Sequence, residues 1–179
     1  MKLIIAIDPG ASGGIAWHDG QPHVEPMPET SIDVKDLFVR ILSTPGAGTV
    51  EVHVEKVGGY IGGDDSAKGS AMFGFGFGTG FVHGCLAMAE VPVIETTPQR
   101  WQKELGMGTR QHQRLEPGVT YRPEQRRAIL AADARLKTEW KTKLKGEAQR
   151  RYPGLKVTKK TADALLILSA AMSQKHIGG

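Results

Sequence analysis

The strongest constraint on the fold lies at the start of the chain, where an aliphatic segment runs directly into an acid and a tight turn. Residues 3–7 are all aliphatic, and Asp8 follows them immediately. A turn that contains Gly13 and Gly14 comes next, after which the chain returns as a second strand. This arrangement predicts a carboxylate held at the edge of the core, beside a backbone bare enough for a phosphate or a metal ion to approach.

Length and composition indicate one soluble domain. The 179 residues suit a single domain spanning 1–179, whose core is large enough to need no disulfide. Cys85 is the only cysteine, which excludes an internal disulfide and favours a reducing compartment. No apolar run approaches the length of a membrane span, and Met1-Lys2 leads straight into the first strand with no signal peptide. We therefore expect a soluble, intracellular protein with no membrane partner.

Positive charge is concentrated in residues 110–160. This segment holds 15 of the 23 Lys and Arg residues and 5 of the 19 acids, a net charge of +10. The rest of the chain carries 8 basic and 14 acidic residues, a net charge of −6. A basic segment attracts a polyanion, and acids elsewhere can hold a metal that screens its charge. The asymmetry favours contact with nucleic acid, and a solvated helix face is the alternative interpretation.

Hydrophobic periodicity predicts an α/β domain. Strands are expected at 2–8, 13–18, 22–27, 50–57 and 91–95, and helices at 31–42, 70–89, 99–105, 123–152 and 162–173. Side chains alternate along a strand, so Glu51, His53 and Glu55 share one face of the fourth. Residues 107–122 have no clear period and are expected to form a loop.

The expected helix over 70–89 carries phenylalanine and glycine, each repeated at intervals of four. The repeats are Phe73, Phe77, Phe81 and Gly76, Gly80, Gly84. The glycine spacing predicts a smooth stripe for packing or dimerisation. No phosphate-binding fingerprint follows a strand here, so we expect no nucleotide cofactor.

Three acids stand at the ends of expected elements. Asp8 ends the first strand, Glu55 lies near the end of the fourth, and Asp163 lies in the first turn of the last helix. If the first and fourth strands are neighbours and the last helix crosses their ends, the three carboxylates converge. Such oxygens suit Mg²⁺ or Mn²⁺, which would polarise a phosphodiester and activate a water. Three unrelated surface acids are the alternative.

These acids belong to an ordered set of motifs that resembles the RuvC family of Holliday-junction resolvases. The motifs are Ile7-Asp8-Pro9-Gly10 with Gly13-Gly14, then Val54-Glu55, and finally Thr161-Ala162-Asp163-Ala164-Leu165-Leu166. The segment from Ser70 through Val93 to Lys103 resembles the phage-type branch of that family. The resemblance covers about residues 2–106 and 139–173, and residues 107–138 look like a basic insertion.

The resemblance implies an RNase H-like fold, a mixed five-stranded sheet flanked by helices. It implies a metal-dependent, structure-selective DNA endonuclease, a crossover junction endodeoxyribonuclease acting in recombination and repair. A homodimer would nick two opposed strands of a four-way junction symmetrically with a metal-activated water, leaving ligatable ends. Asp8, Glu55 and Asp163 would bind Mg²⁺ or Mn²⁺. The expected location is the cytoplasm of a bacterium or of a phage-infected host cell.

Lys160 departs from the family pattern. Bacterial members carry a fourth acid or a histidine three residues before the last aspartate, and this chain has Lys160 there. A protonated ammonium cannot ligate a metal. Either a second metal is held by fewer protein ligands, or Lys160 contacts the scissile phosphate or positions the attacking water. A plain solvent-exposed lysine is the alternative.

Further residues are candidates for contact with DNA. Lys56 and Lys68 flank the loop after Glu55, and Tyr60 within that loop could stack on an unpaired base. The arginine candidates for phosphate contact are Arg126, Arg127, Arg150 and Arg151. Trp101 and Trp140 are expected in the core or an interface instead.

Other functions start from the same features. An actin-like ATPase or kinase shares the opening hairpin, but this chain has no length for the second domain that it needs and no candidate for its second phosphate loop. A branched-DNA-binding module without catalysis would fit Lys160. A nuclease of the same fold acting on flaps, forks or RNA–DNA hybrids is the third alternative.

Overall fold

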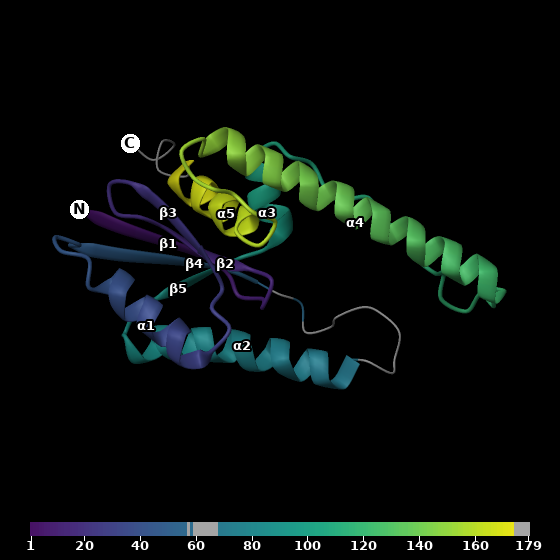
Figure 1. Cartoon of the computed structure of the whole chain (residues 1–179), viewed down its shortest axis with the longest axis horizontal. Coiled ribbons are helices and arrows are strands. Elements are labelled where there is room, and N and C mark those ends of the chain that lie inside the picture. Colours follow the sequence, from purple (N-terminus) through teal and green to yellow (C-terminus); the bar gives the residue numbers. More distant parts are fainter. Residues whose placement is uncertain (57, 59–67, 174–179) are drawn as a thin grey trace.

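A single mixed sheet forms the centre of the computed structural model, which describes residues 1–56, 58 and 68–173 (Figure 1). Its five strands lie in the order β3-β2-β1-β4-β5. They are β1 (Lys2–Asp8), β2 (Gly14–His18), β3 (Pro22–Pro26), β4 (Thr49–Glu55) and β5 (Val93–Thr96). β1 is antiparallel to β2 and parallel to β4, so the first and fourth strands are neighbours, which is the condition for the three acids to converge.

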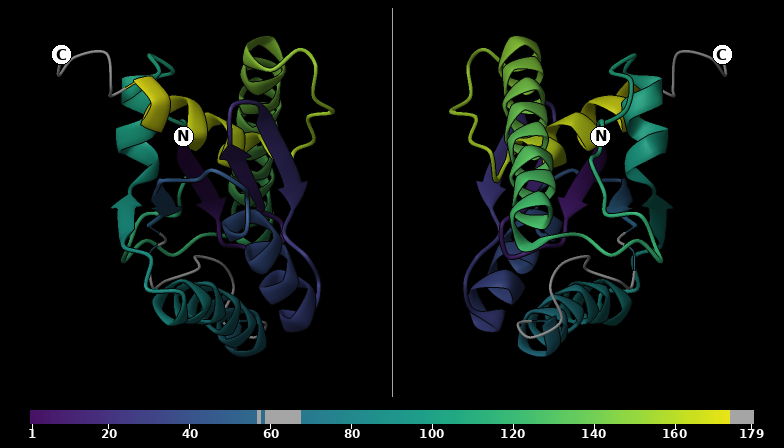
Figure 2. Two further views of the ribbon diagram at one scale, coloured as in Figure 1. Left: turned by 90° about the vertical axis from the view of Figure 1, so that its left-hand side faces the viewer. Right: turned by 90° about the vertical axis from the view of Figure 1, so that its right-hand side faces the viewer.

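Helices cover both faces of this sheet (Figures 1 and 2). α1 (Ser31–Leu42) and α2 (Lys68–Met88) lie on one face. The other face carries α3 (Pro98–Glu104), α4 (Pro123–Arg151) and α5 (Ala162–Ser173). The predicted mixed five-stranded sheet flanked by helices is confirmed. Within the described ranges, no helix combines the length and apolar character needed to cross a membrane.

The predicted helices and strands are present, with shifted ends. The fourth strand ends at Glu55 rather than at residue 57, and the last strand begins at Val93 rather than at residue 91. Helix α2 starts at Lys68 and α4 at Pro123, and residues 107–122 contain no helix or strand. The second half of the expected insertion is therefore the first part of a long helix.

Strand β1 divides its side chains between two cores. Leu3, Ile5 and Ile7 pack in the core beneath α1 and α2. Ile4 and Ala6 point the opposite way and pack against α5. Because side chains alternate along a strand, Asp8 continues the face that α5 covers. This alternation sets the position of the first acid.

Candidate metal centre

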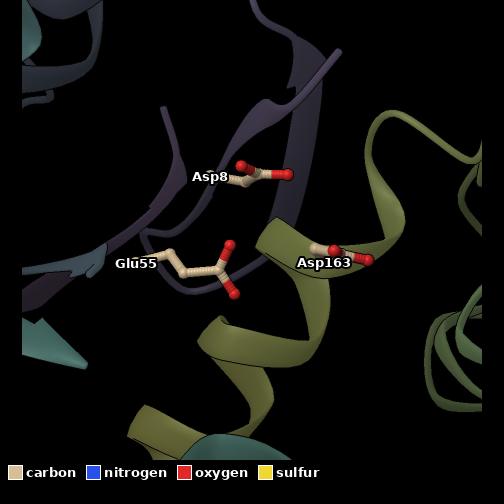
Figure 3. A group of neighbouring side chains, drawn as sticks. All are labelled: Asp8, Glu55 and Asp163. Carbon is tan, nitrogen blue, oxygen red and sulfur yellow. The ribbon is translucent and has the colours of Figure 1, made fainter. Parts of the chain in front are cut away.

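The three acids singled out from the sequence meet at one edge of the sheet. Asp8 ends β1, Glu55 ends β4, and Asp163 lies in the first turn of α5. Each offers a carboxylate oxygen within 4.8 Å of the others (Figure 3). They meet because β1 and β4 are parallel neighbours that end together, and α5 begins beside those ends. Residues 155 positions apart in the chain thus share one site.

The turn after Asp8 accepts only glycine at its tightest point. A Cβ on Gly13 would lie 2.2 Å from the main-chain oxygen of Asp8 and 2.7 Å from its Cγ. The turn closes through a hydrogen bond from the Gly13 amide to the Gly10 carbonyl at 2.7 Å. The Gly10 amide also donates to Oδ1 of Asp8 at 3.4 Å. The small residues of this segment therefore bring backbone against the carboxylate.

Two other side chains hold the remaining carboxylates. Trp101 of α3 is fully buried and donates from Nε1 to Oε1 of Glu55 at 2.9 Å. Lys141 of α4 donates from Nζ to Oδ2 of Asp163 at 2.5 Å. The other oxygen of that aspartate, Oδ1, is buried and has no hydrogen-bond partner within the described residues. Asp163 thus presents one bound and one unpartnered oxygen.

The local electrostatics disfavour three ionised carboxylates without a cation. Burial, reinforced by the charge of Asp163, raises the pKa of Asp8 to about 6. Burial and the charge of Asp8 raise the pKa of Glu55 to about 8, although the Trp101 hydrogen bond opposes this. Burial alone would lower the pKa of Lys141, but the charge and hydrogen bond of Asp163 and the charges of Asp8 and Glu55 together outweigh it, so the net pKa is raised. A hard divalent cation would relieve this repulsion, and carboxylate oxygens are its preferred ligands.

Lys141 is the residue that the sequence analysis missed. It precedes Leu144 by three residues and Ala148 by seven, spacings that put all three on the same face of α4. Leu144 and Ala148 are both buried. A lysine at helical spacing from two apolar residues is the signal that could have identified it.

The role of Lys160 at the scissile phosphate stays a prediction. Lys160 is exposed in the turn before α5, and no contact with the three acids is found in the described part of the chain.

Trp101 is a core residue, as expected, but it also holds Glu55. His53 is buried and bonded through Nε2 to Oε1 of Glu51 at 2.9 Å, away from the cluster.

The candidate DNA-contacting residues are spread around this centre. Lys56 follows Glu55 directly, is 59% exposed and pairs with Glu95 at 3.0 Å. Arg126 and Arg127 are exposed near the start of α4. Arg150 and Arg151 at its other end pair with Glu147 at 2.6 and 2.7 Å. Tyr60 lies outside the described residues, as does the side chain of Lys68 at the start of α2.

Comparisons with known proteins bear on the fold. No protein-family model matches the chain, and no curated protein does either. Among solved structures, T. thermophilus RuvC in complex with a Holliday junction substrate aligns with a TM-score of 0.56 and 14% identity. That alignment covers 99% of this chain and 97% of the other. The chain has the fold of RuvC.

A second match agrees with the first. A Thermus thermophilus RuvC structure aligns with a TM-score of 0.55 and 16% identity, over 98% of this chain and 96% of that one. The α/β architecture is thus the RNase H-like one expected from the sequence motifs. At these identities the likeness extends to the fold alone.

Proposed function

We propose that this protein is a metal-dependent, structure-selective DNA endonuclease that resolves four-way junctions. The observation that carries the proposal is the cluster of Asp8, Glu55 and Asp163 at the edge of a sheet built as in RuvC. One of the similar RuvC structures is a complex with a Holliday junction substrate. A basic segment next to an acidic cluster suits a polyanionic substrate that is cut with the help of a cation.

The residues present fit a divalent cation. Asp163 Oδ1 is a buried oxygen with no partner in the described ranges. Asp8 and Glu55 each place a carboxylate oxygen within 4.8 Å of a carboxylate oxygen of Asp163. Mg²⁺ or Mn²⁺ held by these three would supply polarisation of the phosphodiester and a more acidic attacking water. Trp101 keeps Glu55 in place, and the Gly10–Gly13 turn keeps Asp8 in place.

Basic residues flank the proposed centre along α4. Helix α4 passes the carboxylates at Lys141 and extends beyond the edge where β1 and β4 end, as does α2 (Figure 1). At 1.5 Å per residue, Arg127 lies about 21 Å before Lys141 and Arg150 about 14 Å after it. We propose that Arg126, Arg127, Arg150 and Arg151 contact phosphates of the junction arms. Lys56, Tyr60, Lys68 and Lys160 would contact DNA nearer the cut, with Lys160 at the scissile phosphate.

Paired nicks require two copies of the chain. The described residues of one chain contain one acidic cluster of this kind, so symmetric cuts need a second copy. Helix α2 exposes Phe73 and Phe77 at 75% and 57%. A groove of about 590 Å³ between α1 and α2 continues this apolar face. We propose that this apolar face packs against the same face of a second copy of the chain. Sedimentation equilibrium, which measures the mass in solution, would test for the dimer.

Cleavage of a labelled synthetic four-way junction tests the proposed function. The junction is incubated with Mg²⁺, with Mn²⁺ and with EDTA, beside a linear duplex and an RNA–DNA hybrid. We expect paired symmetric nicks in the junction alone, lost in EDTA. Tight junction binding without cleavage under either metal would replace the proposal with a DNA-binding module. Preferential cutting of the hybrid would mean that the substrate is an RNA–DNA hybrid instead of a junction.

We further propose that the protein belongs to the phage-type branch of the RuvC family. It would act in the cytoplasm of a bacterial or phage-infected cell.

A further inference from the structure

We propose that Lys141 takes the place of a second metal ion, so that the carboxylate cluster binds one divalent cation per chain. The inference rests on the proposed metal-dependent function and specifies how that metal site is completed. It starts from the ion pair between Lys141 Nζ and Asp163 Oδ2 at 2.5 Å.

Each carboxylate of the cluster has one oxygen engaged by a donor from the protein. The Gly10 amide donates to Asp8 Oδ1, Trp101 Nε1 to Glu55 Oε1, and Lys141 Nζ to Asp163 Oδ2. The second oxygen of each carboxylate accepts no hydrogen bond from the described residues. For Asp163 this oxygen, Oδ1, is buried. Each carboxylate therefore has one oxygen left to bind an ion, and the three residues lie close enough to share a single one.

The Lys141 ammonium lies where a second ion on the Asp163 side of the cluster would bind. Paired metal ions lie about 3.5–4 Å apart, and the Asp163 oxygen that an ion on this side would use, Oδ2, is already held by the ammonium. An ammonium donates hydrogen bonds but cannot ligate a metal, so it excludes an ion from this side. Lys160 is exposed and makes no such contact, so the excluding residue is Lys141 rather than the lysine next to the last helix.

The formal charges give the same stoichiometry. Three carboxylates and one ammonium leave two negative charges, which one divalent cation neutralises. A second divalent cation would leave two positive charges beside Glu55 and Asp163, which are only 9% and 5% exposed. Uncompensated charge at buried positions is costly, so the second ion is disfavoured before DNA binds.

Counting bound Mn²⁺ in the absence of DNA tests the inference. Equilibrium dialysis gives the number of ions per chain, and low-temperature electron paramagnetic resonance separates single ions from spin-coupled pairs. We expect one uncoupled Mn²⁺ in the wild-type protein. Lys141→Met frees Asp163 Oδ2 and leaves three negative charges, so we expect a second Mn²⁺ and a spin-coupled spectrum. Lys141→Arg keeps the positive charge, and Lys160→Met changes an exposed lysine, so both should still bind one.

The outcomes separate this inference from the proposed function. Two Mn²⁺ in the wild type, or one in both the wild type and Lys141→Met, overturns the role of Lys141 while leaving a metal-dependent nuclease in place. No Mn²⁺ in the wild type overturns the metal site and with it both proposals. Circular dichroism of each variant checks folding. If Lys141→Met does not fold, the counts for the wild type and Lys141→Arg still decide the stoichiometry.

Discussion

The two faces of the central sheet are built on the same strands but differ in chemistry. Beneath α1 and α2 the buried side chains of the core cluster are all apolar. The buried polar side chains of the described residues instead belong to the α5 face, its flanking turn or α3: His53, Glu55, Thr96, Gln102, Thr161, Asp163 and Ser169. One-residue alternation along β1 and β4 therefore separates a stabilising core from a candidate reactive site.

The difference follows from the helices that cover each face. Helix α5 is buried along residues 162–171 and begins where the parallel strands end, so the carboxylate of its first turn lies against theirs. Helix α2 carries no acid in its first turn, and the acids Asp33 and Asp36 of α1 face solvent. Substitutions on the two faces should consequently separate loss of chemistry from loss of folding.

The largest expected effect is that of Asp8→Asn on cleavage. The change removes charge from the proposed metal site, where a bound cation supplies several kcal/mol to the transition state. We expect four-way-junction cleavage to fall by at least about 100-fold, with junction binding retained, because the basic surface is intact. Asp36→Asn, an exposed acid on the opposite side, should leave cleavage unchanged. Comparable loss of junction binding in metal-free buffer would contradict this division of labour.

Ile5→Ala should give the converse result. Ile5 is fully buried on the α1–α2 face, so its truncation leaves a cavity. The free energy of unfolding, measured by urea denaturation, should fall by about 2–5 kcal/mol. Mn²⁺ affinity of the folded variant should equal that of the wild type. Ile32→Ala, at a position 69% exposed, should change stability little. A folded Ile5→Ala variant that has lost Mn²⁺ binding would show that the two faces are coupled.

Trp101→Phe should weaken metal binding without removing a ligand. The variant keeps an aromatic ring but loses the Nε1–H that holds Glu55 Oε1. Loss of a partner of this kind lowers metal affinity by about 10–100-fold, which titration calorimetry with Mn²⁺ would measure. Trp140→Phe, a half-buried tryptophan of α4, is the matched control and should bind Mn²⁺ as the wild type does. Equal affinities for both variants would remove Trp101 from the site.

The smallest expected effect is the pH dependence of stability in EDTA. The pKa of Glu55 is about 8 in the folded protein against an ordinary 4.5, so between these values the folded state binds more protons than the unfolded state. Raising the pH through this window therefore favours unfolding, on the order of 2 kcal/mol since coupled carboxyls share the shift. Thermal melts should show a falling Tm that Glu55→Gln flattens. A Tm independent of pH would argue against three crowded carboxylates.

Periodicity in the sequence was enough to predict most of the fold. The alternation in residues 50–55 and the aliphatic run before Asp8 identify strands, because burial on a pleated sheet selects those patterns. The pattern placed two of the acids at strand ends and the third in the first turn of a helix. Predicting that the three converge also required the order of the strands, which the resemblance of the ordered motifs implied and no single residue did.

The sequence was enough to locate each strand and helix to within a few residues and to place the three acids near their ends, since these depend on patterns within a few residues of one another. Tertiary packing selects the lysine that meets the carboxylates and the side chain that holds Glu55. Lys160 is three residues from Asp163 yet exposed, whereas Lys141 lies 22 residues away and pairs with it. Trp101 reaches Glu55 across 46 residues. Such contacts depend on how helices pack over the sheet, so spacing along the chain does not determine them.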